Sequence, residues 1–165
     1  MTEINTKEAQ NAILQLSELM RYLLYESEKG DTRLSSEIGF MKNYIELMKL
    51  RLSDKVSLSF SFPDQFNDIT FPPLLFVSFI ENAFKHGISY REQSFIHIEL
   101  SLNENKIHFI CKNSIGSKVE NGEESGIGLE NIKKRLTLLF PEKHNLKIVQ
   151  TDKTFEIDLA ITISN

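Results

Sequence analysis

Cysteine is nearly absent from this sequence, and its scarcity excludes several kinds of site. Cys111 is the only cysteine among 165 residues, so neither an intramolecular disulfide nor a cluster of thiolate metal ligands can form. We expect Cys111 to be a small apolar strand residue in a reducing cytoplasm. Zinc chemistry and acyl transfer also lack support, because the four histidines are scattered and no serine lies in a GxSxG motif.

Long apolar stretches and dense basic runs are missing as well. The longest apolar stretch, residues 71–80, contains two prolines and a serine, whereas a membrane helix needs about 20 apolar residues. The polar start, MTEINTKEAQ, does not have the pattern of a signal peptide. A formal net charge of -4 without a run of lysine or arginine argues against a nucleic-acid or anionic lipid surface. A small anionic ligand needs only a local site and is not excluded.

The composition that is present is that of an ordinary globular protein. Hydrophobic residues make up 41% and charged residues 25% of the chain, and twelve phenylalanines supply bulky core material in the absence of tryptophan. A chain of 165 residues can form one domain, or a compact domain with a short helical appendage. We expect the second arrangement.

Residues 1–53 have the pattern of a helical hairpin. Apolar residues recur with alternating spacings of three and four in two segments: Ile13, Leu16, Met20 and Leu23, then Ile38, Met41, Ile45 and Met48. Between the segments, Gly30 is expected to end the first helix, and Thr32 or a following serine to cap the second. The narrow apolar seam of such a hairpin should pack either on the following domain or on a second copy of itself.

Residues 54–165 change to the pattern of a mixed sheet with helices on one face. Strict alternation predicts strands near residues 56–62, 96–102, 107–111 and 155–163, with a short strand at 146–149 and a turn at 103–106. Helices are predicted at 73–86, with proline in the first turn, and at 129–140. The polar loop 114–126 is either a mobile flap or an ordinary surface loop. The fold class is therefore α+β.

One polar stripe of the first of these helices has groups suited to magnesium and phosphate. Asn82, Lys85 and His86 follow the i, i+3, i+4 spacing that places them together on the helix. An amide oxygen is a hard ligand for Mg²⁺, and lysine and histidine can neutralise phosphate charge, although a solvated helix face has the same pattern. Glu81 could polarise an attacking group, or could simply pair with Lys85 one turn later.

A second cluster, SGIGLENI at residues 125–132, places two glycines at the expected start of the other helix. Gly126 and Gly128 would let backbone N–H groups approach a phosphate at a helix N-terminus, where the helix dipole favours negative charge. A GxG sequence alone is common and weakly specific.

Together the two clusters resemble the motifs of a known family. IENAFKHG at 80–87 resembles the N box, and SGIGLENIKKRL at 125–136 the second glycine box, of GHKL ATPases. The likeness is narrower to sensor histidine kinases that pair with LytTR-type response regulators, because LMRYLL at 19–24, the LxxE of Leu34 and Glu37, and YIELMKLR at 44–51 resemble their dimerisation region. This resemblance covers nearly the whole chain. It implies a Bergerat-type two-layer α/β sandwich at 54–165 that binds ATP and Mg²⁺.

The resemblance also implies roles for individual residues. Asn82 would bind Mg²⁺, Lys85 and His86 would approach the phosphates, and Glu81 would help to activate the accepting group. The set is completed by Leu129 and by the two glycines that shape the lid-side phosphate loop, Gly126 and Gly128. The implied partners are a LytTR-type response regulator and, through the hairpin, a second copy of the chain.

Two departures from the family pattern matter. The phosphoacceptor motif PHFLFN is absent, and none of the four histidines has such a context, so we expect this chain not to phosphorylate itself on histidine. It would then be a fragment of a longer sensor, whose missing N-terminal region anchors it to the inner membrane. In the first glycine box, CKNSIG places Asn113 where the family has aspartate. Because an amide carbonyl is a weaker acceptor than a carboxylate, we expect weakened rather than lost ATP affinity.

Three functions remain open from the sequence. The leading hypothesis is the ATP-binding catalytic module of a two-component sensor histidine kinase. The first alternative is a degenerate nucleotide-binding module that serves interactions only. The second is a GHKL serine kinase of the anti-sigma type, against which the N-terminal hairpin argues.

Overall fold

The structure, a computed structural model, describes residues 2–116 and 123–164 and contains two compact units. The first unit consists of Met1–Arg51 with Asn67–Leu74, and the second of Leu52–Phe66 with Leu75–Asn165. None of the helices within the described ranges is long and apolar enough to cross a membrane.

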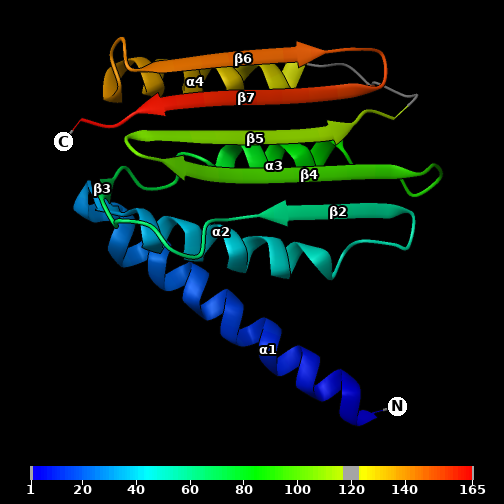
Figure 1. The fold of residues 1–165 in the computed structure, drawn as a ribbon. Coiled ribbons are helices and arrows are strands. Elements are labelled where there is room, and N and C mark those ends of the chain that lie inside the picture. Colours follow the sequence, from blue (N-terminus) through cyan, green and yellow to red (C-terminus); the bar gives the residue numbers. More distant parts are fainter. Residues whose placement is uncertain (1, 117–122, 165) are drawn as a thin grey trace. The chain divides into compact units, whose positions relative to one another are not determined.

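The first unit is built on a helical hairpin (Figure 1). Helix α1 (Thr2–Arg21) continues into a π-helical turn η1 (Tyr22–Glu26) and a 3₁₀ turn η2 (Ser27–Lys29), and α2 (Leu34–Lys49) returns. Gly30, with a φ of 84°, ends the first helical segment, as expected from the sequence. The α2 residues Ile38, Met41 and Ile45 are buried, whereas the four apolar residues of the α1 pattern are exposed by 44 to 63%: Ile13, Leu16, Met20 and Leu23.

The start of α2 is capped by a residue from far along the chain. Arg33 occupies the N-cap position without a side-chain capping bond, so the predicted cap by Thr32 or a serine is wrong. Asp68 accepts a 3.0 Å hydrogen bond from the backbone N–H of Ser35 and a 2.6 Å bond from its hydroxyl. This arrangement is possible because β1 (Thr32–Arg33) pairs antiparallel with β3 (Thr70–Phe71). Partial burial opposes ionisation of Asp68, but the bonds from Ser35 and Arg33 outweigh it and lower the pKa of the carboxyl group.

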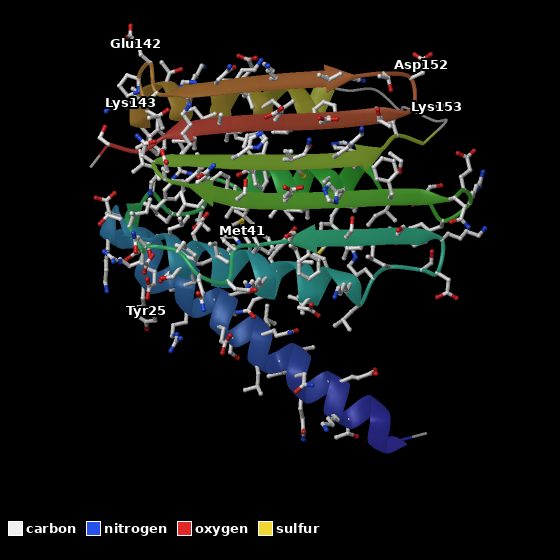
Figure 2. The ribbon with its side chains drawn as sticks, in the orientation of Figure 1. Tyr25, Met41, Glu142, Lys143, Asp152 and Lys153 are labelled. Carbon is white, nitrogen blue, oxygen red and sulfur yellow. The ribbon has the colours of Figure 1, made fainter. Side chains whose placement is uncertain are left out.

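A buried carboxylate joins three segments of the first unit. Glu37 on α2 is fully buried, and its Oε2 accepts hydrogen bonds from the Tyr22 hydroxyl at 2.6 Å and the Leu74 N–H at 3.0 Å. Burial of the phenol, together with its bond to Glu37, raises the pKa of Tyr22. By contrast, Tyr25 on the same π-helical turn projects to solvent and is 66% exposed (Figure 2).

The second unit is a five-stranded mixed sheet with α3 (Val77–His86) and α4 (Glu123–Leu139) on one face, the arrangement that the sequence predicts (Figure 1). Its order is β2-β4-β5-β7-β6, and among the described strands β2 and β4 form a parallel pair, while the other neighbours are antiparallel. The strands are β2 (Val56–Ser61), β4 (Ser94–Asn103), β5 (Lys106–Ser114), β6 (His144–Gln150) and β7 (Thr154–Thr162).

The core of this unit lies between the sheet and the helices. Alternate residues of the central strands are buried because they face α3 and α4. The ring of Phe109 lies 4.8 Å from that of Phe76 and 5.8 Å from that of Phe79, measured between centroids. Cys111 on the same strand is buried near the carbonyl of Phe79, and burial raises the pKa of its thiol to about 12. The expectation of an apolar strand cysteine is confirmed.

The two helices differ from the predicted ranges. Helix α3 begins at Val77 and not at Pro73, because Leu74 has a φ of 60°, a left-handed conformation that interrupts a helix. Helix α4 begins at Glu123, so Gly126 and Gly128 lie within its first turns and do not precede it. Residues 117–122 of the predicted flap lie outside the described part of the chain.

Candidate functional site

A cleft of about 350 Å³ lies between α3 and α4 in the second unit, within the size range of small-ligand sites. Its α3 wall contains Ser78, Glu81, Asn82, Lys85 and His86. These polar residues lie together on one side of α3 because its other side, with Phe79, Ile80 and Ala83, is buried against the sheet. The four candidate residues that the sequence places on this helix therefore share one cleft.

Helix α4 forms the opposite wall. Gly128 and Leu129, both predicted as site residues, line the cleft together with Asn131, Ile132 and Arg135. For Gly126, the structure describes only its place in the first turn of α4. Asn131 and Arg135 were not predicted as site residues. The signal that could have found them is the successive spacing of three residues from Gly128 to Asn131 and four from Asn131 to Arg135, which places all three residues on one stripe of the helix.

The cleft has a chemical composition that suits a magnesium-bound phosphate chain. Three basic side chains, Lys85, His86 and Arg135, line the cleft together with Asn82. Within the described residues no group of three histidine, cysteine or acidic side chains could hold a metal. A metal bound here would have few protein ligands, which is the way Mg²⁺ binds when water and substrate phosphates complete its coordination. The amide oxygen of Asn82 is a hard ligand of the kind that Mg²⁺ takes.

Glu81 is the acidic residue of the α3 stripe. Its side chain is exposed in the cleft and forms no hydrogen bond or ion pair with the residues that the structure describes. The structure therefore does not contain the Glu81–Lys85 ion pair that the sequence allowed as an alternative role for Glu81. A carboxylate in this position is available to accept a proton or to orient an attacking group.

Asn113 lies at the end of β5, beside the end of α3, and is not a lining residue of the cleft. It is 2% exposed, and its Nδ2 donates a 2.9 Å hydrogen bond to the Ser114 carbonyl. Its Oδ1 accepts no hydrogen bond from the described residues. A Cβ on Gly87, the residue after α3, would lie 2.7 Å from the Asn113 Cβ. The carbonyl oxygen of Asn113 therefore has no donor among the described residues, and its side chain packs beside Gly87, the residue that follows His86.

The other histidines lie away from the cleft. His97 on β4 and His108 on β5 alternate with buried residues and therefore point to the sheet face opposite the helices. Nδ1 of His97 is 2.8 Å from the Ser59 hydroxyl, and Nε2 of His108 is 2.7 Å from Asp158. His144 at the start of β6 has Nδ1 2.7 Å from the Phe140 carbonyl oxygen. Among the four histidines, His86 is the cleft residue.

Comparisons with solved structures define the class of fold. The catalytic domain of histidine kinase ThkA superposes with a TM-score of 0.56 over 80% of this chain and 93% of its own, at 11% identity. The histidine kinase domain of the Erythrobacter litoralis EL346 blue-light activated kinase gives a TM-score of 0.53 over 95% of this chain and 80% of its own, at 12% identity. The fold is that of a GHKL-type histidine kinase catalytic domain.

Sequence comparisons identify a narrower group of similar proteins than the comparison of folds. Residues 1–56 match the family model described as Histidine kinase. The sensor protein LytS of Oceanobacillus iheyensis is 25% identical over the whole of this chain, and the sensor histidine kinase/phosphatase LytS of Staphylococcus aureus is 26% identical over 92% of it. The chain spans 31% and 28% of the lengths of these two relatives. Over the region that the matches cover, the chain is similar to the LytS sensor histidine kinases.

Proposed function

We propose that the second unit binds Mg-ATP in the cleft between α3 and α4 and presents the γ-phosphate to a histidine, as the catalytic module of a sensor histidine kinase. The observation that carries this proposal is the convergence of Asn82, Lys85 and His86 with Gly128 on one cleft. These residues come from two motifs that begin 45 positions apart in the sequence, at residues 80 and 125. Relatives named as sensor histidine kinases support the same activity.

The polar residues of the α3 wall have separate parts in the proposed reaction. Lys85 and His86 neutralise the phosphate chain, and Asn82 contributes an oxygen ligand to Mg²⁺. Mg²⁺, when bound, would neutralise part of the charge of the phosphates. Glu81 orients the accepting imidazole and accepts its proton as the N–P bond forms and the bond to the ADP oxygen breaks. Such transfer depends mainly on positioning and electrostatics.

Asn113 serves in place of the family's aspartate in base recognition. The amino group of adenine donates to Oδ1, the acceptor that no described residue uses. The bond lacks the charge of a carboxylate, so the affinity for ATP is reduced and not lost.

The proposed partners follow from the first unit and from the relatives. The exposed apolar residues of α1 form a seam that a second copy of the chain would cover, which makes the module a homodimer. A sensor histidine kinase transfers its phosphoryl group to a response regulator, here one of the LytTR type. The accepting histidine is none of the four in this chain, because none of them lies on α1 or α2.

Calorimetric titration of Mg-ATP into the wild-type chain and into Asn82→Ala tests the proposal. We expect binding in the micromolar to submillimolar range that Asn82→Ala abolishes. Asn145→Ala is the matched control, because Asn145 is an exposed residue of β6 outside the cleft. Absence of binding to the wild-type chain would reject the catalytic module and favour the degenerate interaction module. Phosphorylation of a partner protein on serine would favour the anti-sigma type of kinase.

A further inference from the structure

The directions of α3 and α4 determine which end of the cleft receives each part of a nucleotide. Strand β5 ends next to the turn between β6 and β7, where the Ile115 N–H donates to the Lys153 carbonyl at 2.8 Å. Helix α4 begins at this end of the sheet and finishes at the opposite end, where Lys143 N–H donates to the Phe140 carbonyl (Figure 1). Figure 2 shows Asp152 with Lys153, and Glu142 with Lys143, at these two ends.

Helix α3 runs in the opposite direction to α4. It leads through Gly87 to the start of β4, which lies beside the end of β5 because the two strands are antiparallel. The approach of Gly87 to Asn113 places the end of α3 at the same end of the sheet. The end of α3 and the start of α4 therefore share one end of the cleft, and the start of α3 and the later turns of α4 share the other.

Arg135 lies at the end of the cleft away from Asn113. It follows Gly128 by seven residues, or about two helical turns and about 10 Å along α4. Ser78 and Glu81, in the first half of α3, line the cleft at this end. Arg135 is half-buried, and it lies between the buried residues Ile132 and Leu136 on α4, which fix the side of the helix that it occupies.

We infer that Arg135 is a ligand of the terminal phosphate of ATP. This inference rests on the proposed function, since it takes the base to lie at Asn113. From there the phosphate chain passes Lys85 and Asn82 and reaches Glu81 and Arg135 last. A guanidinium group binds two phosphate oxygens at once and stabilises the charge that develops on the transferred group. Arg135 thereby distinguishes ATP from ADP, which has no phosphate at that end.

The test compares ATP with ADP, each with Mg²⁺, on the wild-type chain and on Arg135→Gln, Arg135→Lys and Lys134→Gln. Arg135→Gln should weaken ATP binding at least about tenfold and change ADP binding less than about twofold, because only ATP places a charged phosphate at the guanidinium. Arg135→Lys should retain part of the affinity for ATP. Lys134→Gln removes the same charge from an exposed α4 position outside the cleft and should leave both affinities unchanged.

The outcomes separate this inference from the proposed function. Equal losses for ATP and ADP, or no loss for either, in Arg135→Gln would overturn the role of Arg135 while wild-type binding of Mg-ATP stands. Circular dichroism of each variant checks that it is folded. If Arg135→Gln does not fold, Arg135→Lys decides by the same ratio of ATP to ADP affinity. Absence of nucleotide binding by the wild-type chain would overturn the proposed function and this inference together.

Discussion

Gly87 and Asn113 approach each other so closely that a single added carbon on the glycine would lie 2.7 Å from the Cβ of the asparagine. The same carbon would lie 2.5 Å from the Ala83 carbonyl oxygen, which accepts the hydrogen bond that closes α3. The end of α3 can therefore reach the end of β5 only because residue 87 lacks a side chain. The motif that contains Gly87 and the motif that contains Asn113 thus pack against each other, and this packing requires glycine at position 87.

We predict that Gly87→Ala lowers the free energy of unfolding of the second unit by about 1–3 kcal/mol, because backbone atoms on one side leave no room for the methyl group. It should also weaken ATP binding by displacing Asn113. Gly39→Ala is the control, since nothing lies within 4 Å of the carbon that it adds and alanine favours the interior of α2. Chemical denaturation measures both variants. Equal stability of Gly87→Ala and the wild-type chain would contradict the close approach.

Asn113 should set the selectivity for adenine. In Asn113→Ala the ratio of ATP to GTP affinity should fall toward one, because the acceptor for the adenine amino group is removed. Asn113→Asp should lower the free energy of unfolding by about 1–3 kcal/mol, since a buried carboxylate would face the Ser114 carbonyl that now accepts a bond from Nδ2. Titration of both nucleotides and a thermal melt test these expectations. Unchanged selectivity in Asn113→Ala would show that the base is recognised elsewhere.

Loss of the Tyr22 hydroxyl should destabilise the first unit. Tyr22→Phe removes a donor from the buried Glu37 carboxylate, at a cost of about 1–3 kcal/mol. Hydrogen exchange of the α2 backbone amides reports on this unit directly. Tyr25→Phe removes the same group from the exposed residue and should have no effect. Equal protection in the two variants would contradict a stabilising role for the Tyr22 bond.

The same bond predicts a dependence on pH. The folded state raises the pKa of Tyr22, so it favours the neutral phenol over the ionised one. The stabilisation is fully present below the ordinary tyrosine pKa of about 10 and is lost as the pH rises above it. The free energy of opening of α2 should therefore fall above about pH 10 in the wild-type chain. The decline should be smaller in Tyr22→Phe, and identical profiles would reject the linkage.

The apolar seam of α1 should mediate dimerisation. Leu16→Glu places a charge in the middle of the exposed residues Ile13 to Leu23, where desolvation of the carboxylate would oppose association. We expect a dimer for the wild-type chain and a monomer for Leu16→Glu by light scattering at micromolar concentration. Leu138→Glu changes an exposed leucine of α4 outside the seam and should leave the dimer intact. A monomeric wild-type chain would exclude this use of the seam.

The sheet could be predicted from the sequence because one face of it is buried. Strands β4, β5 and β7 alternate apolar and polar residues, and the buried set matches that alternation. The α3 side of the cleft could be predicted for a similar reason, since its polar stripe is what remains when Phe79, Ile80 and Ala83 face the core. Both predictions depend on local periodicity alone.

Features that depend on distant residues could not be predicted. The cap of α2 comes from Asp68, more than 30 residues after the position that it caps, and no local pattern indicates it. The late start of α3 depends on Leu74, whose left-handed conformation accompanies a bond to Glu37. Arg135 belongs to the basic run KKR, in which the sequence does not show which member faces the cleft. The buried residues Ile132 and Leu136 fix the side of α4 that packs on the core, and this orientation places Arg135 in the cleft.

The chain crosses the boundary between its two units three times, because Asn67–Leu74 returns to the first unit after Leu52–Phe66 has entered the second. The hairpin is consequently not a detachable module. A chain cut after residue 53 would lose β3, which pairs with β1, and the Asp68 carboxylate that caps α2. To graft the hairpin onto another kinase, the eight residues Asn67–Leu74 would have to be transferred with it, in place of the corresponding segment of the recipient. In limited proteolysis, a chimera that keeps the recipient's own segment at these eight positions should be cleaved near the start of α2 faster than a chimera that carries Asn67–Leu74.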